Sequence, residues 1–243
     1  MGETEDSDAW YNKGVTLGSL GRYKEAIVCY DEAIKLDPED STAWYNKGVA
    51  LGLLENYEEA IVCYDEVIKL DPVNSTAWKN KGHSLGSLGR YEEAIVCYDE
   101  AIKLYPVKTS AWNNKGNSLD SLRRHKEAIV CYDEAIQLDP ESPSAWNNKG
   151  RSLSSLLNYK EAIVFFDEAI KLDPEDSLAW YNKGHSLGSL GRHKEAIVCF
   201  DEVIKLDPES SAAWWNKSHS LDSLERYEEA ERCLAKVKEL DES

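Results

Sequence analysis

Tryptophan recurs every 34 residues along this chain, seven times in succession and with no insertion or deletion between copies. The series is Trp10, Trp44, Trp78, Trp112, Trp146, Trp180 and Trp214. A fixed period of this length is typical of arrays in which no unit can bury its apolar face alone and stacked neighbours complete the core. The 243 residues are therefore expected to form seven stacked units, although length alone would suggest one or two globular domains.

Each unit is predicted to contain two helices. In the opening unit the first helix is expected from about Asp8 to Leu20, with Ser7 as its N-cap and an inward face made of Ala9, Trp10, Gly14, Leu17 and Leu20. The second helix is expected from about Tyr23 to Leu36, where apolar residues recur at helical spacing. Pro38 follows and stops it, and Ser41 is the predicted cap of the next unit.

The repeated residues resemble the tetratricopeptide repeat pattern. That pattern reads Trp-x-x-Leu-Gly-x-x-Tyr, then Ala-x-x-x-aromatic, then Pro; here it is matched by Trp10, Gly14, Ala26, Tyr30 and Pro38. Two positions depart in every copy, where lysine replaces the first leucine and leucine replaces the first tyrosine. The resemblance implies an all-α fold, a right-handed superhelical solenoid of antiparallel helix pairs.

The period also predicts where each repeat begins and ends. A tail at residues 1–6 precedes repeats at 7–40, 41–74, 75–108, 109–142, 143–176, 177–210 and 211–243. The second helix of the last repeat has polar residues where the others are apolar, since it reads Ala230-Glu231-Arg232-Cys233-Leu234-Ala235-Lys236. Such residues suit an outer surface with no further neighbour, so this repeat is predicted to be a cap.

The charge balance limits the partners. With 28 Lys and Arg against 45 Asp and Glu, the net charge of -17 argues against nucleic acid and against an anionic membrane as partners. No apolar run approaches the length that spans a bilayer, and residues 1–9 do not resemble a secretory signal. The six cysteines occupy one position of the repeat, too far apart for disulfides, so we expect free thiols and a cytoplasmic location.

The sequence predicts no enzyme and no cofactor. The five histidines are not arranged with a nucleophile in a known motif, and there is no phosphate-binding loop or His-Glu-x-x-His helix. His185 and His219 on neighbouring repeats, with Asp222 one turn after the latter, form a weak candidate for a divalent metal site.

The lysine that recurs in every repeat is interpreted as structural. The series is Lys13, Lys47, Lys81, Lys115, Lys149, Lys183 and Lys217. Its aliphatic stem is expected to pack between repeats while its ammonium reaches a carboxylate of a nearby helix.

The family resemblance implies a peptide-binding concave groove lined by the first helices, at the positions of Asp8, Tyr11, Asn12, Val15, Gly18 and Ser19. The predicted groove residues are Tyr11, Asn12, Val15, Tyr45, Asn46, Val49, Lys79, Asn80, His83, Asn113, Asn114, Asn117, Asn147, Asn148, Arg151, Tyr181, Asn182, His185, Trp215, Asn216 and His219. The invariant asparagine among them has two open interpretations: it binds an extended peptide backbone, or it bonds to the neighbouring repeat.

Variation along the groove suggests its ligand. The N-terminal stretch is apolar and aromatic, the centre carries Lys79, His83 and Arg151, and a second aromatic stretch follows. Cations and amides in the groove of so acidic a protein predict an acidic or carboxylate-bearing ligand. Co-chaperone members of the family hold a terminal carboxylate with five residues. Lys79 and Asn114 match that set, whereas His83, Ser144 and Asn148 depart from it.

The favoured hypothesis is a scaffold or adaptor that binds an extended, partly acidic protein segment, with Tyr11, Tyr45, Tyr181 and Trp215 as aromatic anchors. The alternative is a structural segment that self-associates, or stacks in a larger array, through its uncapped N-terminal end.

Overall fold

The computed structural model describes residues 6–242 of the chain. This part contains fourteen α-helices and no strand. The helices are α1 Ser7–Ser19, α2 Tyr23–Leu36, α3 Ser41–Leu53, α4 Tyr57–Leu70, α5 Ser75–Ser87, α6 Tyr91–Leu104, α7 Thr109–Ser121, α8 His125–Leu138, α9 Pro143–Ser155, α10 Tyr159–Leu172, α11 Ser177–Ser189, α12 His193–Leu206, α13 Ser211–Asp222 and α14 Tyr227–Asp241.

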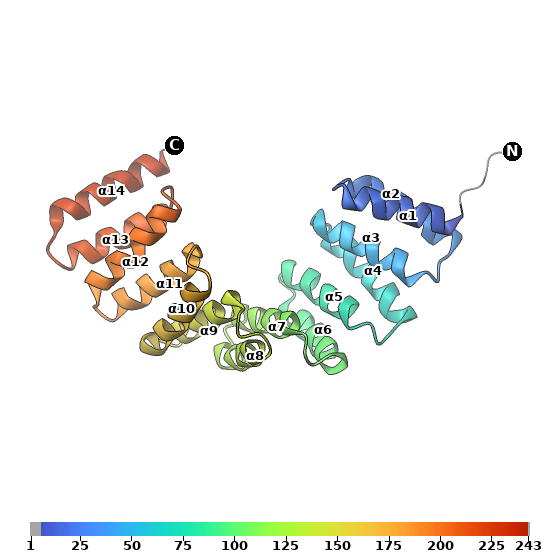
Figure 1. Ribbon diagram of the computed structural model, residues 1–243, viewed down its shortest axis with the longest axis horizontal. Coiled ribbons are helices and arrows are strands. Elements are labelled where there is room, and N and C mark those ends of the chain that lie inside the picture. The colour runs from blue at the N-terminus through green and yellow to red at the C-terminus, as the bar shows by residue number, and fades with distance from the viewer. Residues whose placement is uncertain (1–5, 243) are drawn as a thin grey trace. The chain divides into compact units, whose positions relative to one another are not determined.

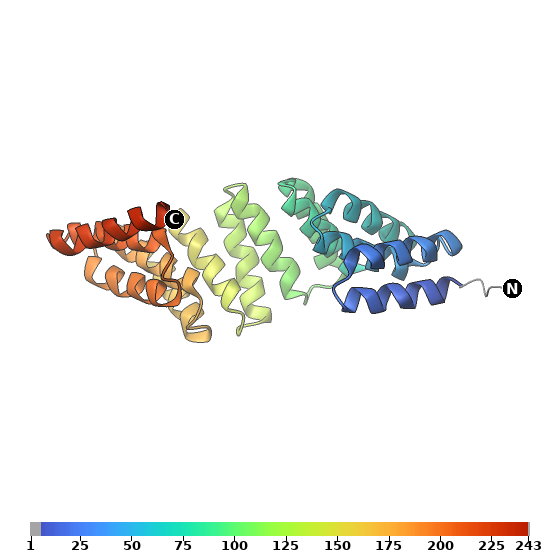
Figure 2. The same cartoon turned by 90° about the horizontal axis from the view of Figure 1, so that it is seen from above.

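The helices fall into two compact units that divide between Leu122 and Arg123. Unit 1 holds α1 to α7 and unit 2 holds α8 to α14, so the two helices of the fourth repeat belong to different units. Within each unit, helices pack against their neighbours in chain order, and the first helices of successive repeats also touch, as α1 and α3 do. Figures 1 and 2 show this succession of helix pairs in each unit. The predicted all-α solenoid is confirmed.

The first helices begin one residue earlier than expected. Asp6, and not Ser7, caps α1, since its carboxylate accepts a hydrogen bond from the Ala9 backbone N–H at 2.8 Å. Asp40 caps α3 in the same way through the Thr42 backbone N–H at 2.9 Å, and Ser41 is already helical. A carboxylate at this end also interacts favourably with the helix dipole, which explains why aspartate takes the cap.

One backbone conformation joins the two helices of every repeat. Gly21, Gly89 and Gly191 have φ of 74° to 75° in this turn. Four other residues take the same left-handed conformation with φ between 59° and 63°, namely Glu55, Arg123, Leu157 and Glu225. A side chain costs about 1–2 kcal/mol there, so the repeat geometry imposes this turn even where glycine is missing.

Within a repeat, glycine of the first helix lies against an aromatic ring of the second. A Cβ atom added to Gly82 would lie 2.8 Å from Cε1 of Tyr98, which is buried. The last repeat changes both partners together. Ser218 replaces the glycine and Leu234 replaces the ring.

A hydrogen bond fixes each loop between repeats. The indole Nε1 of Trp44 donates to the Pro38 carbonyl oxygen at 3.1 Å. The same bond, at 2.9 to 3.1 Å, recurs at Trp78, Trp112, Trp146, Trp180 and Trp214, each with the proline carbonyl six residues earlier. The tryptophan thus both fills space and ties its helix to the preceding loop, a role that its spacing did not predict.

The two ends of the array differ from its interior. Ala9 and Leu20, predicted to face inward, are exposed because no described repeat covers α1, whereas the equivalent Ala43 is fully buried. At the other end, α14 fully buries only Ala230 and Cys233, while α12 buries five residues. The polar outer surface of α14 is consistent with the predicted cap.

Gly82→Ala is expected to lower the free energy of unfolding by about 1–3 kcal/mol, because the new methyl group overlaps the Tyr98 ring. Gly86→Ala in the same helix is the matched control. Its Cβ meets nothing closer than 3.8 Å, and alanine is the better helix former, so stability should hold or rise by about 0.5–1 kcal/mol. Urea unfolding followed by circular dichroism measures both, and equal losses would contradict this account.

Candidate functional site: the groove of the first helices

The predicted groove positions line a hollow at the N-terminal end of unit 1. It has a volume of about 440 Å³ and lies between α1, α2 and α3. Its walls are Tyr11, Val15, Gly18, Ser19, Tyr23, Tyr30, Asn46, Val49, Ala50 and Leu53. Aliphatic and aromatic groups dominate this list, as the sequence predicted for the N-terminal stretch.

Three hollows of about 330, 340 and 430 Å³ follow one another along the same positions in unit 2, and His185 lines all of them. The predicted residues that the structure brings together here are Arg151, Tyr181, Asn182, His185, Trp215, Asn216 and His219. Trp215 is 50% exposed and its ring stacks on that of His219, with centroids 5.3 Å apart.

The remaining predicted residues stand at the equivalent repeat positions of their own first helices. Asn12, Tyr45, Lys79, Asn80, His83, Asn113, Asn114 and Asn117 lie in unit 1, and Asn147 and Asn148 lie in unit 2. The predicted cationic centre is thus divided, with Lys79 and His83 in one unit and Arg151 in the other.

The asparagine row links neighbouring repeats. Nδ2 of Asn46 donates to the hydroxyl of Tyr11 at 3.0 Å, and Asn80 does the same to Tyr45 at 3.1 Å. In unit 2, Asn216 donates to the Tyr181 hydroxyl and Asn182 to Oδ1 of Asn147. Of the two interpretations left open, the bond between repeats therefore holds at these four positions. It also ties the hydroxyl groups of three predicted aromatic anchors to the scaffold.

Lys79 breaks this pattern. It takes the place of the tyrosine acceptor, and an ammonium cannot accept a hydrogen bond from Asn114. Burial lowers the pKa of Lys79, and neither a carboxylate nor any other hydrogen-bond acceptor for it is found among residues 6–242. Lys108 lies nearby and donates to Oγ1 of Thr76 at 2.6 Å. Its pKa is lowered by burial and, to a smaller extent, by the charge of Lys79.

The scaffold lysines behave differently. Nζ of Lys81 lies 2.5 Å from Oδ1 of Asp65 on the preceding repeat, and it sits over the Trp78 ring at 5.7 Å from the centroid. The equivalent ion pairs are Lys47–Asp31, Lys115–Asp99, Lys149–Asp133, Lys183–Asp167 and Lys217–Asp201. The ammonium thus reaches a neighbouring carboxylate, as expected. Lys13 makes only the contact with its tryptophan, Trp10, among the described residues.

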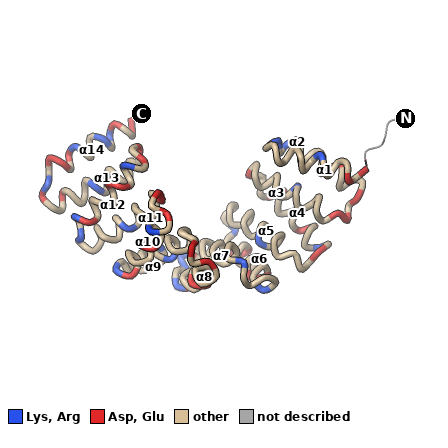
Figure 3. Tube along the Cα trace, viewed as in Figure 1, with Lys and Arg blue, Asp and Glu red and all other residues tan. Residues whose placement is uncertain are grey.

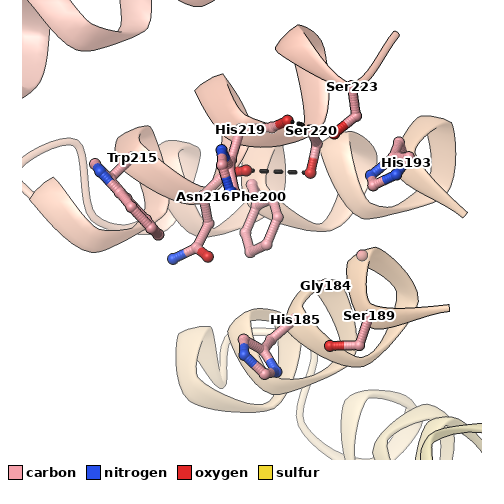
Figure 4. A pocket seen from close by; sticks show the side chains of 11 residues that line it. Gly184, His185, Ser189, His193, Phe200, Trp215, Asn216, His219, Ser220 and Ser223 are labelled. Atoms are coloured by element: carbon pink, nitrogen blue, oxygen red, sulfur yellow. Dashed lines mark hydrogen bonds between the residues drawn. The ribbon is translucent and has the colours of Figure 1, made fainter. Parts of the chain in front are cut away.

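His193 was not predicted as a groove residue, yet it lines the 340 Å³ hollow together with His185 and His219 (Figure 4). Its Nδ1 atom is buried without a hydrogen-bond partner. In the sequence, His193 occupies the first position of a second helix, where five other repeats have tyrosine. Lys108 was missed because it precedes its helix and belongs to no repeated row.

The weak metal candidate finds no support. Asp222 does not line the hollow that holds His185 and His219. Among the described residues, no group of three or more His, Cys, Asp or Glu side chains is placed to hold a metal ion.

The six cysteines, all within the described residues, are buried and form no disulfide. Burial raises the pKa of the Cys63, Cys97 and Cys199 thiols to about 11, so these groups stay protonated and unreactive near neutral pH. They pack in the core and do not contribute to the groove.

Stacked helix pairs with hollows along one row of helices define a helical-repeat protein. Tetratricopeptide repeat models match residues 7–40, 41–74, 75–106, 109–142, 143–176, 177–210 and 211–243. The chain belongs to the tetratricopeptide repeat family. A comparison with curated proteins finds no match.

Solved structures share the fold. A tetratricopeptide repeat protein from Parabacteroides merdae is 16% identical with a TM-score of 0.76, over 96% of this chain and 93% of that one. PilF from Pseudomonas aeruginosa is 20% identical with a TM-score of 0.71, over 84% and 93%. YrrB, described as having an unusual peptide-binding site, is 23% identical with a TM-score of 0.63, over 76% and 95%.

None of the helices in the described part is both long and apolar enough to cross a membrane.

Lys81→Ala is expected to lower the free energy of unfolding by about 1 kcal/mol, because it removes the ion pair with Asp65 and the contact with Trp78. Ligand binding in the groove should not change. Lys24→Ala, at an exposed lysine on α2, is the control and should leave stability within about 0.5 kcal/mol of the parent. Thermal melting compares the two; an unchanged melting temperature for Lys81→Ala would contradict the structural role.

Proposed function

We propose that the protein is a scaffold or adaptor that binds an extended, partly acidic segment of another protein along the groove of its first helices. It acts by binding and performs no chemistry. The observation that carries the proposal is Lys79, a half-buried cation in a groove position without a carboxylate partner among residues 6–242, close to a second lysine, Lys108.

The energetics favour an anion at this place. Burial makes both charged ammonium groups less stable than they would be in water, and the charge of Lys79 acts on Lys108. A carboxylate from a partner would relieve both effects with charge-assisted hydrogen bonds. Acidic residues occur along both units (Figure 3), so these local cations are needed to attract an acidic segment to this face.

Other groove residues would fix the remainder of the segment. The apolar hollow around Val15 and Val49 suits an aliphatic or aromatic side chain, and the exposed Trp215 offers a flat apolar surface. Buried cysteines that form no disulfide suit a reducing compartment, which supports a cytoplasmic location.

The exposed outer face of α1 supports the alternative function, stacking through the N-terminal end. Ala9 and Lys13 are exposed there, although their equivalents in later repeats contact a preceding repeat. A second copy of this chain is a poor match for that face, since Ala235 replaces the aspartate that would pair with Lys13. A partner helix that carries a carboxylate at this position is the better fit.

We expect light scattering to give the mass of a monomer at every concentration. Growth of the mass with concentration, abolished by Lys13→Glu, would instead favour self-association through α1.

Lys79→Glu is expected to weaken binding of a labelled acetyl-hexaglutamate-amide peptide at least tenfold, measured by fluorescence anisotropy at constant ionic strength. The reason is that the variant places a carboxylate where the proposal needs a cation. Acetyl-hexaglutamine-amide should bind the parent more weakly than hexaglutamate does.

Lys24→Glu provides the matched control. It makes the same change of charge on α2, at a position where other repeats already have Glu58 and Glu92, and it should bind hexaglutamate like the parent. An equal effect of both variants, or none from Lys79→Glu, would contradict the proposed function.

A further inference from the structure

The 340 Å³ hollow in unit 2 gathers three histidines from three helices. His185 comes from α11, His193 from α12 and His219 from α13, and no Asp or Glu lines the hollow. Figure 4 shows Trp215, His219 and Ser220 of α13, with Ser223 directly after that helix, on one side of the hollow and His185 and Ser189 of α11 on the other. In a chain with 45 acidic residues, a hollow lined by histidines alone among titratable groups is an unusual local environment.

A hollow at the equivalent repeat positions lies at the N-terminal end of unit 1, but different side chains line it. Both are built from corresponding repeat positions, so their linings can be compared residue by residue. Val15, Tyr23, Val49, Ala50 and Leu53 of the N-terminal hollow correspond to His185, His193, His219, Ser220 and Ser223 of this one. Five replacements have therefore converted an apolar hollow into one lined by imidazole and hydroxyl groups, while the helices around it are unchanged.

The aromatic ring that forms the floor of the hollow also differs between the two. Tyr30 places its hydroxyl 3.6 Å from where a Cβ on Gly18 would be, but the equivalent Phe200 has no hydroxyl. The floor therefore offers no polar group of its own. The hydroxyl of Ser220 is engaged with the Asn216 carbonyl oxygen at 3.1 Å. The imidazoles are then the principal groups that can receive a charged ligand, and Nδ1 of His193 is buried without a partner.

Charged groups of the neighbouring elements lie to either side. On one side, Arg151 of α9 and Tyr181 line a second hollow with His185. On the other, Asp241 of α14 lines a third hollow with His185 and Trp215, and it accepts a hydrogen bond from the Ser211 hydroxyl at 3.1 Å. The charged residues that line these two adjoining hollows are thus Arg151 and the hydrogen-bonded Asp241.

We infer that the histidine hollow binds the carboxylate of an acidic side chain in the partner segment, and that it does so with an affinity that rises as the pH falls. The inference rests on the proposed function and adds to it a pH-controlled subsite. It is separate from the site at Lys79, which lies in unit 1.

The chemistry of imidazole supplies the pH dependence. A carboxylate can only accept hydrogen bonds, and a protonated imidazole donates from both nitrogens, whereas the neutral ring donates from one. Histidine is the side chain that ordinarily changes its charge between pH 5 and 8. A bound carboxylate favours the protonated rings, so affinity is highest where they are protonated and falls as the pH rises.

The test uses the full chain and labelled acetyl-hexaglutamate-amide, whose side chains stay ionised between pH 5.5 and 7.5. We expect the affinity at pH 5.5 to exceed that at pH 7.5 by about tenfold or more. If binding requires one imidazole to be protonated, the affinity falls by up to about tenfold for each pH unit. In the variant His185→Gln/His219→Gln the pH dependence should disappear. Both residues are exposed, and circular dichroism at each pH establishes that the variant is folded.

Two control variants separate the effect of the histidine hollow on binding from the effects of other histidines and of Lys79. His125→Tyr removes a histidine outside this hollow, at a position that is tyrosine in other repeats, and should keep the pH dependence. Lys79→Glu should weaken binding by a similar factor at every pH. All variants retain the acidic side chains of the parent, so a general effect of protein charge would persist in the double glutamine variant.

An affinity that is the same at both pH values, or a pH dependence that survives His185→Gln/His219→Gln, would overturn this inference and leave the scaffold proposal standing. Absence of hexaglutamate binding at pH 5.5 as well as at pH 7.5 would overturn both.

Discussion

The contact between one repeat and the next is the constraint on which the rest of this structure depends. At each such contact a tryptophan donates to the carbonyl oxygen of the preceding proline, and a lysine lies over an aromatic ring while pairing with an aspartate. Each of these bonds is modest, since exposed ion pairs contribute at most about 1 kcal/mol. Their periodic recurrence matters more, because an insertion in one repeat would displace all of them at that contact. The unbroken period of 34 follows from this geometry.

The scaffold could be predicted from the sequence because its residues are repeated. Fourteen helices within residues 6–242, the second helix at Tyr23–Leu36 and the structural role of the lysines all follow from the period and from apolar spacing. The caps were misplaced by one residue, since serine and aspartate are both good caps and only the backbone geometry shows that Asp6 takes the role. The inward position of Ala9 was wrong because repetition predicts the average repeat and not its ends.

The site was harder to predict, since its residues are those that do not repeat. The groove positions came from the family resemblance, and hollows do line them. The hydrogen bond of each asparagine depends on the residue that the preceding repeat has at the position of Tyr11. Asn80 bonds to Tyr45, whereas the equivalent position for Asn114 is Lys79, whose ammonium cannot accept a hydrogen bond. Lys108 and His193 lie outside the rows that we read as groove positions, and only the folded chain brings them to Lys79 and His219.

Scaffold and recognition are thus carried by different positions of the same repeat. Because the glycine, the tryptophan and the lysine hold the helices in place, the groove residues change without loss of the fold. The hollow that is apolar around Val15 becomes one of histidines around His185. Where the apolar hollow has Tyr30, the histidine hollow has Phe200. A core residue therefore differs between the two hollows together with the surface residues. Such paired changes, at the same backbone geometry, leave one architecture with an apolar hollow, a lysine at a groove position and a hollow lined by histidines.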